Sequence, residues 1–296
     1  MNHLISSLAL LTAAGSAAFT LGPPSAPALQ DGDSARLEFP AASPNATLQQ
    51  RVGVTDVEVV YGRPSMKGRK VFGGLEPYGS VWRTGANAAT RVTFSTDVTL
   101  GGAAVPAGTY ALFSIPGEDL WTVILSKGAE QFGAYGYKEA DDVARIEVKP
   151  ETLSSPVETL AFGFSDLQPG QATMYFEWEN TRVPMELDTH IVDQLQPRIE
   201  AAMAGDGEKP YVACAMFYYE NGLDMDKAAE WMEQGVKAQP NAFWLIYRHG
   251  LILAKKGDKA GAIRAAEKSM ELASQASGSL KAEYMRLNEA LVKSCQ

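Results

Sequence analysis

The chain has 296 residues, a net charge of −9, and a composition that is 46% hydrophobic and 21% charged. These proportions are typical of a globular protein with one or two packed cores, and they exclude a largely disordered chain. Two cysteines are too few for a disulfide framework, so we expect burial of apolar area to hold the fold together. Cys214, in an apolar run, is expected in the core, and the penultimate Cys295 at the surface.

The N-terminal segment predicts a secretory signal peptide over residues 1–28. It contains no Asp, Glu, Lys or Arg, is apolar from Leu4 to Leu21, and ends in the small-residue pattern Ala26-Pro27-Ala28. It is too short and too weakly apolar for a membrane anchor. We therefore expect an exported protein, periplasmic or extracellular, with no stable membrane insertion after cleavage and a flexible linker over residues 29–42.

Residues 43–188 carry the signals of a β domain. Short runs rich in β-branched and aromatic residues alternate with Gly, Pro and Asp turns, without helical segments between them. The expected strands cover residues 56–62, 91–100, 108–117, 120–127, 144–150, 158–166, 172–180 and 181–187. This spacing predicts an all-β, antiparallel sandwich or barrel.

The run "ATMYFEWEN" shows the alternation of a half-buried strand most clearly. Its period of two sends Met174, Phe176 and Trp178 to one face of the sheet, and Glu177 and Glu179 to the other. Paired carboxylates could serve catalysis, but the pattern favours two solvated glutamates on the wet face.

Residues 189–296 predict a helical domain. "MDKAAEWMEQGVKAQP" and "GAIRAAEKSMELAS" have the apolar period of amphipathic helices, and a terminal helix follows over residues 280–294. Ala228 and Ala262 are 34 residues apart, and Gly222 and Gly257 are 35 apart. This period resembles the tetratricopeptide repeat, whose helix pairs bind protein partners. A plain helical bundle without a groove is the alternative.

The acidic charge lies entirely in the β domain, and a basic island interrupts it. Counted over residues 29–193, which carry the whole net charge of −9, the segment from Arg63 to Arg91 holds six cations and one acid, Glu76, for a net charge of +5, and the remaining residues of that range sum to −14. Arginine forks suit carboxylate, phosphate or sulfate, and glycines allow a ligand close to the backbone. The sequence predicts a small anionic or carbohydrate ligand on loop 61–90. The candidate ligand-binding residues are Arg63, Lys67, Arg69, Tyr78, Trp82, Arg83 and Asn87.

A structural role for the same loop is the alternative. A long ordered loop must satisfy its own backbone polar groups, and Arg83 and Asn87 could do so while Trp82 fills the sandwich. Nucleic acid is not expected as a partner, since an acidic protein with one short basic loop lacks an extended positive surface.

At this loop the sequence resembles a known family. "YGRPSMKGRKVFGGLEPYGSVWRTGANAAT", "PAGTYALFSIPG", "WTVILSK" and "QFGAYGY" are similar to the bacterial exported Domain of Unknown Function 2911, over residues 43–187. The resemblance implies secretion and an all-β core, but no activity, ligand or catalytic residue. Ala88 departs from the family pattern, which tends to have an acid there. If that acid balances Arg83, the resemblance implies a freer arginine in this chain.

Signatures of established chemistry do not occur. The chain has no G-x-S-x-G elbow and no phosphate-binding loop, so no catalytic residue and no cofactor are predicted. Asp188, His190 and Asp193 match no standard ligand spacing, and no metal site is predicted. We expect a non-catalytic ligand-binding or scaffold protein with a helical protein-interaction tail. The alternative is a glycan-directed hydrolase or isomerase whose catalytic acid is not identified.

Overall fold

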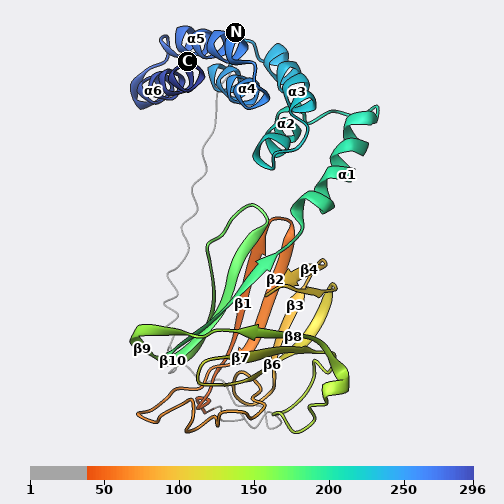
Figure 1. The fold of residues 1–296 in the computed structure, drawn as a ribbon, viewed down its shortest axis with the longest axis vertical. Coiled ribbons are helices and arrows are strands. Elements are labelled where there is room, and N and C mark those ends of the chain that lie inside the picture. Colours follow the sequence, from red (N-terminus) through yellow and green to blue (C-terminus); the bar gives the residue numbers. More distant parts are fainter. Residues whose placement is uncertain (1–38) are drawn as a thin grey trace, which may run out of the picture. The chain divides into compact units, whose positions relative to one another are not determined.

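The computed structural model describes residues 39–296. The signal peptide predicted for residues 1–28, and most of the predicted linker, lie outside the described residues. Ten strands come first along the chain and six α-helices follow (Figure 1). The predicted class, an antiparallel β-sandwich followed by a helical domain, is confirmed.

The strands form two antiparallel sheets. The six-stranded sheet has the order β1-β2-β3-β6-β7-β8 and the four-stranded sheet the order β5-β4-β10-β9. The first sheet comprises β1 (Asn45–Val52), β2 (Thr55–Gly62), β3 (Thr90–Phe94), β6 (Gly108–Ile115), β7 (Trp121–Ser126) and β8 (Asp142–Val148). The second comprises β4 (Val98–Leu100), β5 (Ala103–Val105), β9 (Glu151–Ser165) and β10 (Gln171–Asp188).

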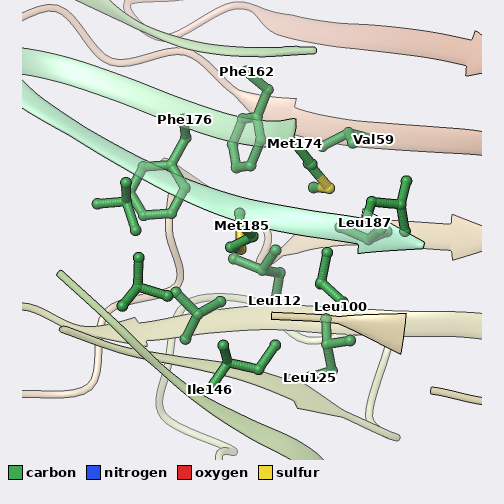
Figure 2. Packing of buried hydrophobic residues seen from close by; sticks show 14 of the residues in the cluster. Val59, Leu100, Leu112, Leu125, Ile146, Phe162, Met174, Phe176, Met185 and Leu187 are labelled. Atoms are coloured by element: carbon green, nitrogen blue, oxygen red, sulfur yellow. The ribbon is translucent and has the colours of Figure 1, made fainter. Parts of the chain in front are cut away.

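The main core lies between the two sheets. In Figure 2, Phe162, Met174 and Phe176 of the β9–β10 hairpin face Leu112, Leu125 and Ile146 of the six-stranded sheet. The two strands predicted over residues 172–180 and 181–187 are one continuous strand, β10, because its inward positions stay apolar from Ala172 to Leu187. The strand predicted over residues 91–100 is instead divided between β3 and β4, which belong to different sheets.

Glu179 corrects the simple alternation predicted for β10. The pairing of β10 with β9 shifts register on both sides of this residue, and its φ is 54°, in the left-handed region. Such a bulge redirects a side chain out of the regular pleat. Glu179 is therefore not a solvated strand residue like its predicted neighbour Glu177, and its carboxylate reaches the basic loop.

The six helices follow the β domain. They are α1 (Ile191–Ala204), α2 (Tyr211–Glu220), α3 (Met225–Ala238), α4 (Phe243–Lys256), α5 (Lys259–Ala273) and α6 (Gly278–Cys295). Asp224 caps α3 by accepting hydrogen bonds from the N–H groups of Asp226 and Lys227. Cys214 is buried as predicted, but Cys295 is buried too, because it packs on α5 in a small cluster around Ala262 and Ala266. Both cysteines are free.

The positions matched by the 34-residue period have similar environments. Ala228 in α3 and Ala262 in α5 are both fully buried. Gly222 follows α2 with a φ of 66°, and Gly257 follows α4 with a φ of 97°. Among the described helices, none has the length and apolarity that a bilayer crossing requires.

Candidate functional site

The basic loop joins β2 to β3 and is built into the sandwich through two aromatic side chains. Trp82 is 2% exposed, and its ring stacks on Trp178 of β10 with centroids 5.9 Å apart. Its indole N–H donates to the carbonyl of Gly85, so the polar end is satisfied inside the loop. Phe72 packs edge-on against Trp82 and against Trp121 of β7. Trp82 is therefore a core residue, and its ring faces are not available to a ligand.

Three of the predicted ligand residues lie beside β9. Arg63 donates from Nε to the carbonyl of Leu160 at 2.9 Å. The backbone N–H of Lys67 donates to Glu158 Oε1 at 2.9 Å. Arg69 folds back on its own turn, with Nε donating to the carbonyl of Met66 and Nη2 to that of Ser65. Both guanidinium groups, those of Arg63 and Arg69, are thus occupied by backbone carbonyls, and Lys67 is exposed.

The next part of the loop, residues 70–78, forms a compact turn. The N–H of Gly73 donates to the carbonyl of Glu76, and the N–H of Glu76 donates to that of Val71. The ring of Tyr78, 39% exposed, covers Gly73 so closely that a Cβ there would lie 2.6 Å from Tyr78 Cε2.

Glu179 ties this turn to the sandwich. Its carboxylate accepts the backbone N–H groups of Val71 at 3.3 Å and Phe72 at 3.4 Å. The turn is therefore held in place from β10, and the position of its outer residues is fixed before any ligand arrives.

Arg83 and Glu76 form the electrostatic centre of the turn. Both side chains are half-buried, and no ion pair joins them among the described residues. Burial raises the pKa of Glu76 to about 7, and the nearby positive charge of Arg83 opposes the shift only in part. Arg83 Nε is buried without a hydrogen-bond partner. Glu76 is the only acid of the basic island, and it does not pair with Arg83. Arg83 therefore has no counter-ion in the part of the chain that the structure describes.

The whole island shares this lack of neutralisation. Within residues 39–296, none of its six cations forms an ion pair with a carboxylate. The six are Arg63, Lys67, Arg69, Lys70, Arg83 and Arg91. An internal salt-bridge hub, which is one form of the structural alternative, does not exist there.

Asn87 lies at the far end of the loop, away from the turn. It has a φ of 66° and donates from Nδ2 to the carbonyl of Ser43 at 3.3 Å. Its own carbonyl accepts the N–H of Gly133, in the "QFGAYGY" segment. Two of the seven predicted residues, Tyr78 and Arg83, therefore border the turn 70–78. The other five lie outside this site: Trp82 is in the core, Asn87 binds Ser43, and Arg63, Lys67 and Arg69 lie beside β9.

Sequence reasoning missed three residues of this site: Lys70, Glu76 and Glu179. Glu76 carried a signal, since it is the only acid in the basic segment. Lys70 is exposed on the same turn. The bulge that redirects Glu179 also carried a signal, since the inward apolar positions of β10 are even-numbered up to Trp178 and odd-numbered from Val183. Among the described residues, no group of three His, Cys, Asp or Glu side chains is placed to hold a metal ion.

Gly62 fixes where the loop leaves β2. A Cβ at this position would clash with the carbonyl oxygen of Ala86, so the two ends of the loop meet there by direct backbone contact. We predict that Gly62→Ala forces these backbones apart and lowers the free energy of unfolding by about 1–3 kcal/mol, the typical cost of overpacking. Chemical denaturation measures the loss. Gly68→Ala serves as the control for a glycine with open space around it, although its φ of 70° adds some strain.

Comparison with known proteins identifies the β domain. Residues 43–187 match the model of the family described as Protein of unknown function (DUF2911). Neither the search of curated proteins nor the search of solved structures returned a match. The resemblance carried by the basic loop and the "QFGAYGY" segment is thereby confirmed, and the β domain of this chain belongs to the DUF2911 family.

Proposed function

We propose that the protein is an exported, non-catalytic binding protein whose turn 70–78 holds a small anion against Arg83. The observation that carries the proposal is the unpartnered state of Arg83, whose Nε is buried without an acceptor. The Arg83 side chain forms no hydrogen bond and no ion pair with a described residue, so its Nη groups are left to bind an anionic ligand oxygen. A charge-assisted bond to carboxylate, phosphate or sulfate is stronger than one to a neutral acceptor.

The surroundings of Arg83 favour an anion over a neutral sugar. Trp82 is in the core, which leaves Tyr78 as the exposed aromatic ring on this turn. Lys70 adds a second positive charge there, and Glu76, with its pKa near 7, is partly neutral at physiological pH. Export is supported by the uncharged, apolar first 28 residues.

A thermal-shift and calorimetric titration tests the proposal. Sulfate, phosphate and citrate are titrated into the protein, into Arg83→Ala and into the control Lys67→Ala, an exposed cation beside β9. We expect at least one anion to stabilise the parent protein and Lys67→Ala, with binding at least tenfold weaker in Arg83→Ala. If all three anions act equally on the parent and on a folded Arg83→Ala, the site is not at Arg83.

One observation favours a second candidate, a glycan-directed hydrolase or isomerase. A carboxyl group with a pKa near 7 beside a cation is suited to donate a proton at neutral pH. Glu76→Gln separates the two functions, because it abolishes turnover by a general acid but strengthens anion binding by removing a negative charge. A survey with chromogenic glycosides provides the readout for turnover.

For the helical tail we propose contact with a protein partner through tetratricopeptide-like helix pairs. The proposal is supported by the matched environments of Ala228 and Ala262, and by the left-handed glycines that follow α2 and α4. Trp244 of α4, 39% exposed, offers an aromatic contact of the kind enriched at protein interfaces.

A further inference from the structure

A cavity lies on the face of the six-stranded sheet that points away from the main core. It has a volume of about 310 Å³, which is at the lower end of the range for small-molecule sites. Strands β2 and β3 provide its floor, and residues 129–132 provide a wall. Here it is called the Arg91 pocket. Its lining includes Asn45, Val60, Ala88, Arg91, Glu130, Gln131 and Phe132.

The wall of the Arg91 pocket is held in place by backbone hydrogen bonds. The N–H of Ala89 donates to the carbonyl of Gln131 at 2.8 Å, and the N–H of Gly133 donates to that of Asn87 at 3.0 Å. Further along the same segment, Tyr137 packs on Phe113 of β6 and donates a hydrogen bond to Asp142. The "QFGAYGY" segment is therefore anchored at both ends, and the pocket is preformed.

Arg91 places a positive charge on the floor. In the sheet Arg91 pairs with Val60 on one side and Ala111 on the other. Both neighbours have apolar side chains, which cannot accept a hydrogen bond from its guanidinium. Its guanidinium makes no hydrogen bond and no ion pair with any described residue. Glu130, at the exposed edge of the pocket, does not pair with it either. The pocket thus offers a planar donor fork that suits a carboxylate.

The rim carries groups that suit a hydroxylated ligand. Phe132 is 73% exposed and presents an apolar ring face at the pocket. The amide of Asn45 and the carboxylate of Glu130 add polar groups at the exposed edge. An aromatic acid would bind Arg91 but has no groups that hydrogen-bond to Asn45 and Glu130. A sugar acid provides hydroxyl groups for them and an apolar ring face for Phe132.

We infer that the Arg91 pocket binds an acidic saccharide, a uronate residue whose carboxylate pairs with Arg91. Its hydroxyl groups bond to Asn45 and Glu130, and its ring packs on Phe132. This site is separate from the proposed anion site at Arg83, and the inference does not depend on that proposal.

Calorimetric or saturation-transfer NMR titration with D-glucuronate, D-glucose and benzoate tests the inference. We expect glucuronate to bind at least tenfold more tightly than glucose or benzoate. Arg91→Gln should weaken glucuronate binding at least tenfold and remove its advantage over glucose, whereas Phe132→Ala should weaken both sugars. Arg51→Gln, an exposed cation on β1, and Arg83→Ala should bind glucuronate as the parent does.

Each other outcome overturns the inference in a distinct way. If benzoate binds as tightly as glucuronate, the pocket selects a carboxylate and not a saccharide. If glucuronate binding is absent from the parent, or is unchanged in Arg91→Gln, the pocket is not a uronate site. If Arg91→Gln does not fold, Ala88→Glu, which adds a carboxylate at the pocket wall next to the cation, should block glucuronate binding in its place.

Discussion

Replacing Trp82 by alanine lowers the free energy of unfolding by about 3–5 kcal/mol, the usual cost of removing a large buried aromatic side chain. Trp82 is 2% exposed and contacts Trp178, Phe72 and Phe176. The substitution therefore removes apolar contacts with the β9–β10 hairpin and leaves a cavity between the sheets. It also releases the carbonyl of Gly85 from the indole N–H. Urea denaturation followed by circular dichroism measures the loss.

Two control variants show that the effect belongs to the buried ring and not to the surface of the loop. Tyr78→Ala removes a ring that is 39% exposed and should cost less than about 1 kcal/mol. Trp82→Phe keeps most of the apolar volume and should recover more than half of the stability that alanine loses. If Trp82→Ala unfolds at the same denaturant concentration as the parent, the loop is not part of the core.

The β-sandwich could be predicted because its strands alternate clearly. In β2, and in β10 on either side of the bulge, the apolar residues recur at every second position, and Gly or Pro marks many of the turns. The edge strand β1 was not predicted. Its inward positions, Ala46 and Leu48, are only partly buried, and most of its other residues are polar. This composition is typical of a loop. The three-residue strand β5 is too short for any pattern to appear.

The candidate site was predicted less completely, since it depends on contacts between distant parts of the chain. The charge of the basic island pointed to the right loop, but not to which cations lack a partner. Arg63 is occupied by a carbonyl of β9, 97 residues away, and the turn at Val71 is held by Glu179, 108 residues away. No local pattern reports such partners. The bulge at Glu179 shifts the phase of the apolar alternation between Trp178 and Val183, but that shift does not show which backbone groups the redirected carboxylate binds.

Removing the charge of Glu76 changes both the stability and the anion binding of the protein in a pH-dependent manner. Folding raises the pKa of this carboxyl from 4.5 to about 7. Between pH 4.5 and about pH 7 the folded protein retains a proton on Glu76 that the unfolded chain has lost. The contribution of this group to the free energy of unfolding is therefore complete below pH 4.5 and falls as the pH rises to about 7. In Glu76→Gln this decline is absent, and at pH 8 the variant should be about 1–2 kcal/mol more stable than the parent, after allowance for solvent screening.

Anion binding at Arg83 should follow the same protonation. Sulfate keeps its charge across this range, so its affinity reports on the protein alone. Above pH 7 the ionised Glu76 repels the anion and competes for Arg83, and such a repulsion between partly screened charges is worth roughly 1–2 kcal/mol. We therefore expect sulfate affinity in the parent to fall about 5- to 30-fold between pH 6 and pH 8, and to stay level in Glu76→Gln.

Other groups that titrate in this range can be separated from Glu76. In the described residues the histidines are His190, which follows β10, and His249 in α4, and neither belongs to the basic island. The carboxylate of Glu179 also faces the turn, where it accepts the N–H groups of Val71 and Phe72. His190→Gln should therefore keep the pH dependence of the parent. A dependence that persists in Glu76→Gln but disappears in His190→Gln would place the titrating group outside the turn and remove Glu76 from the site.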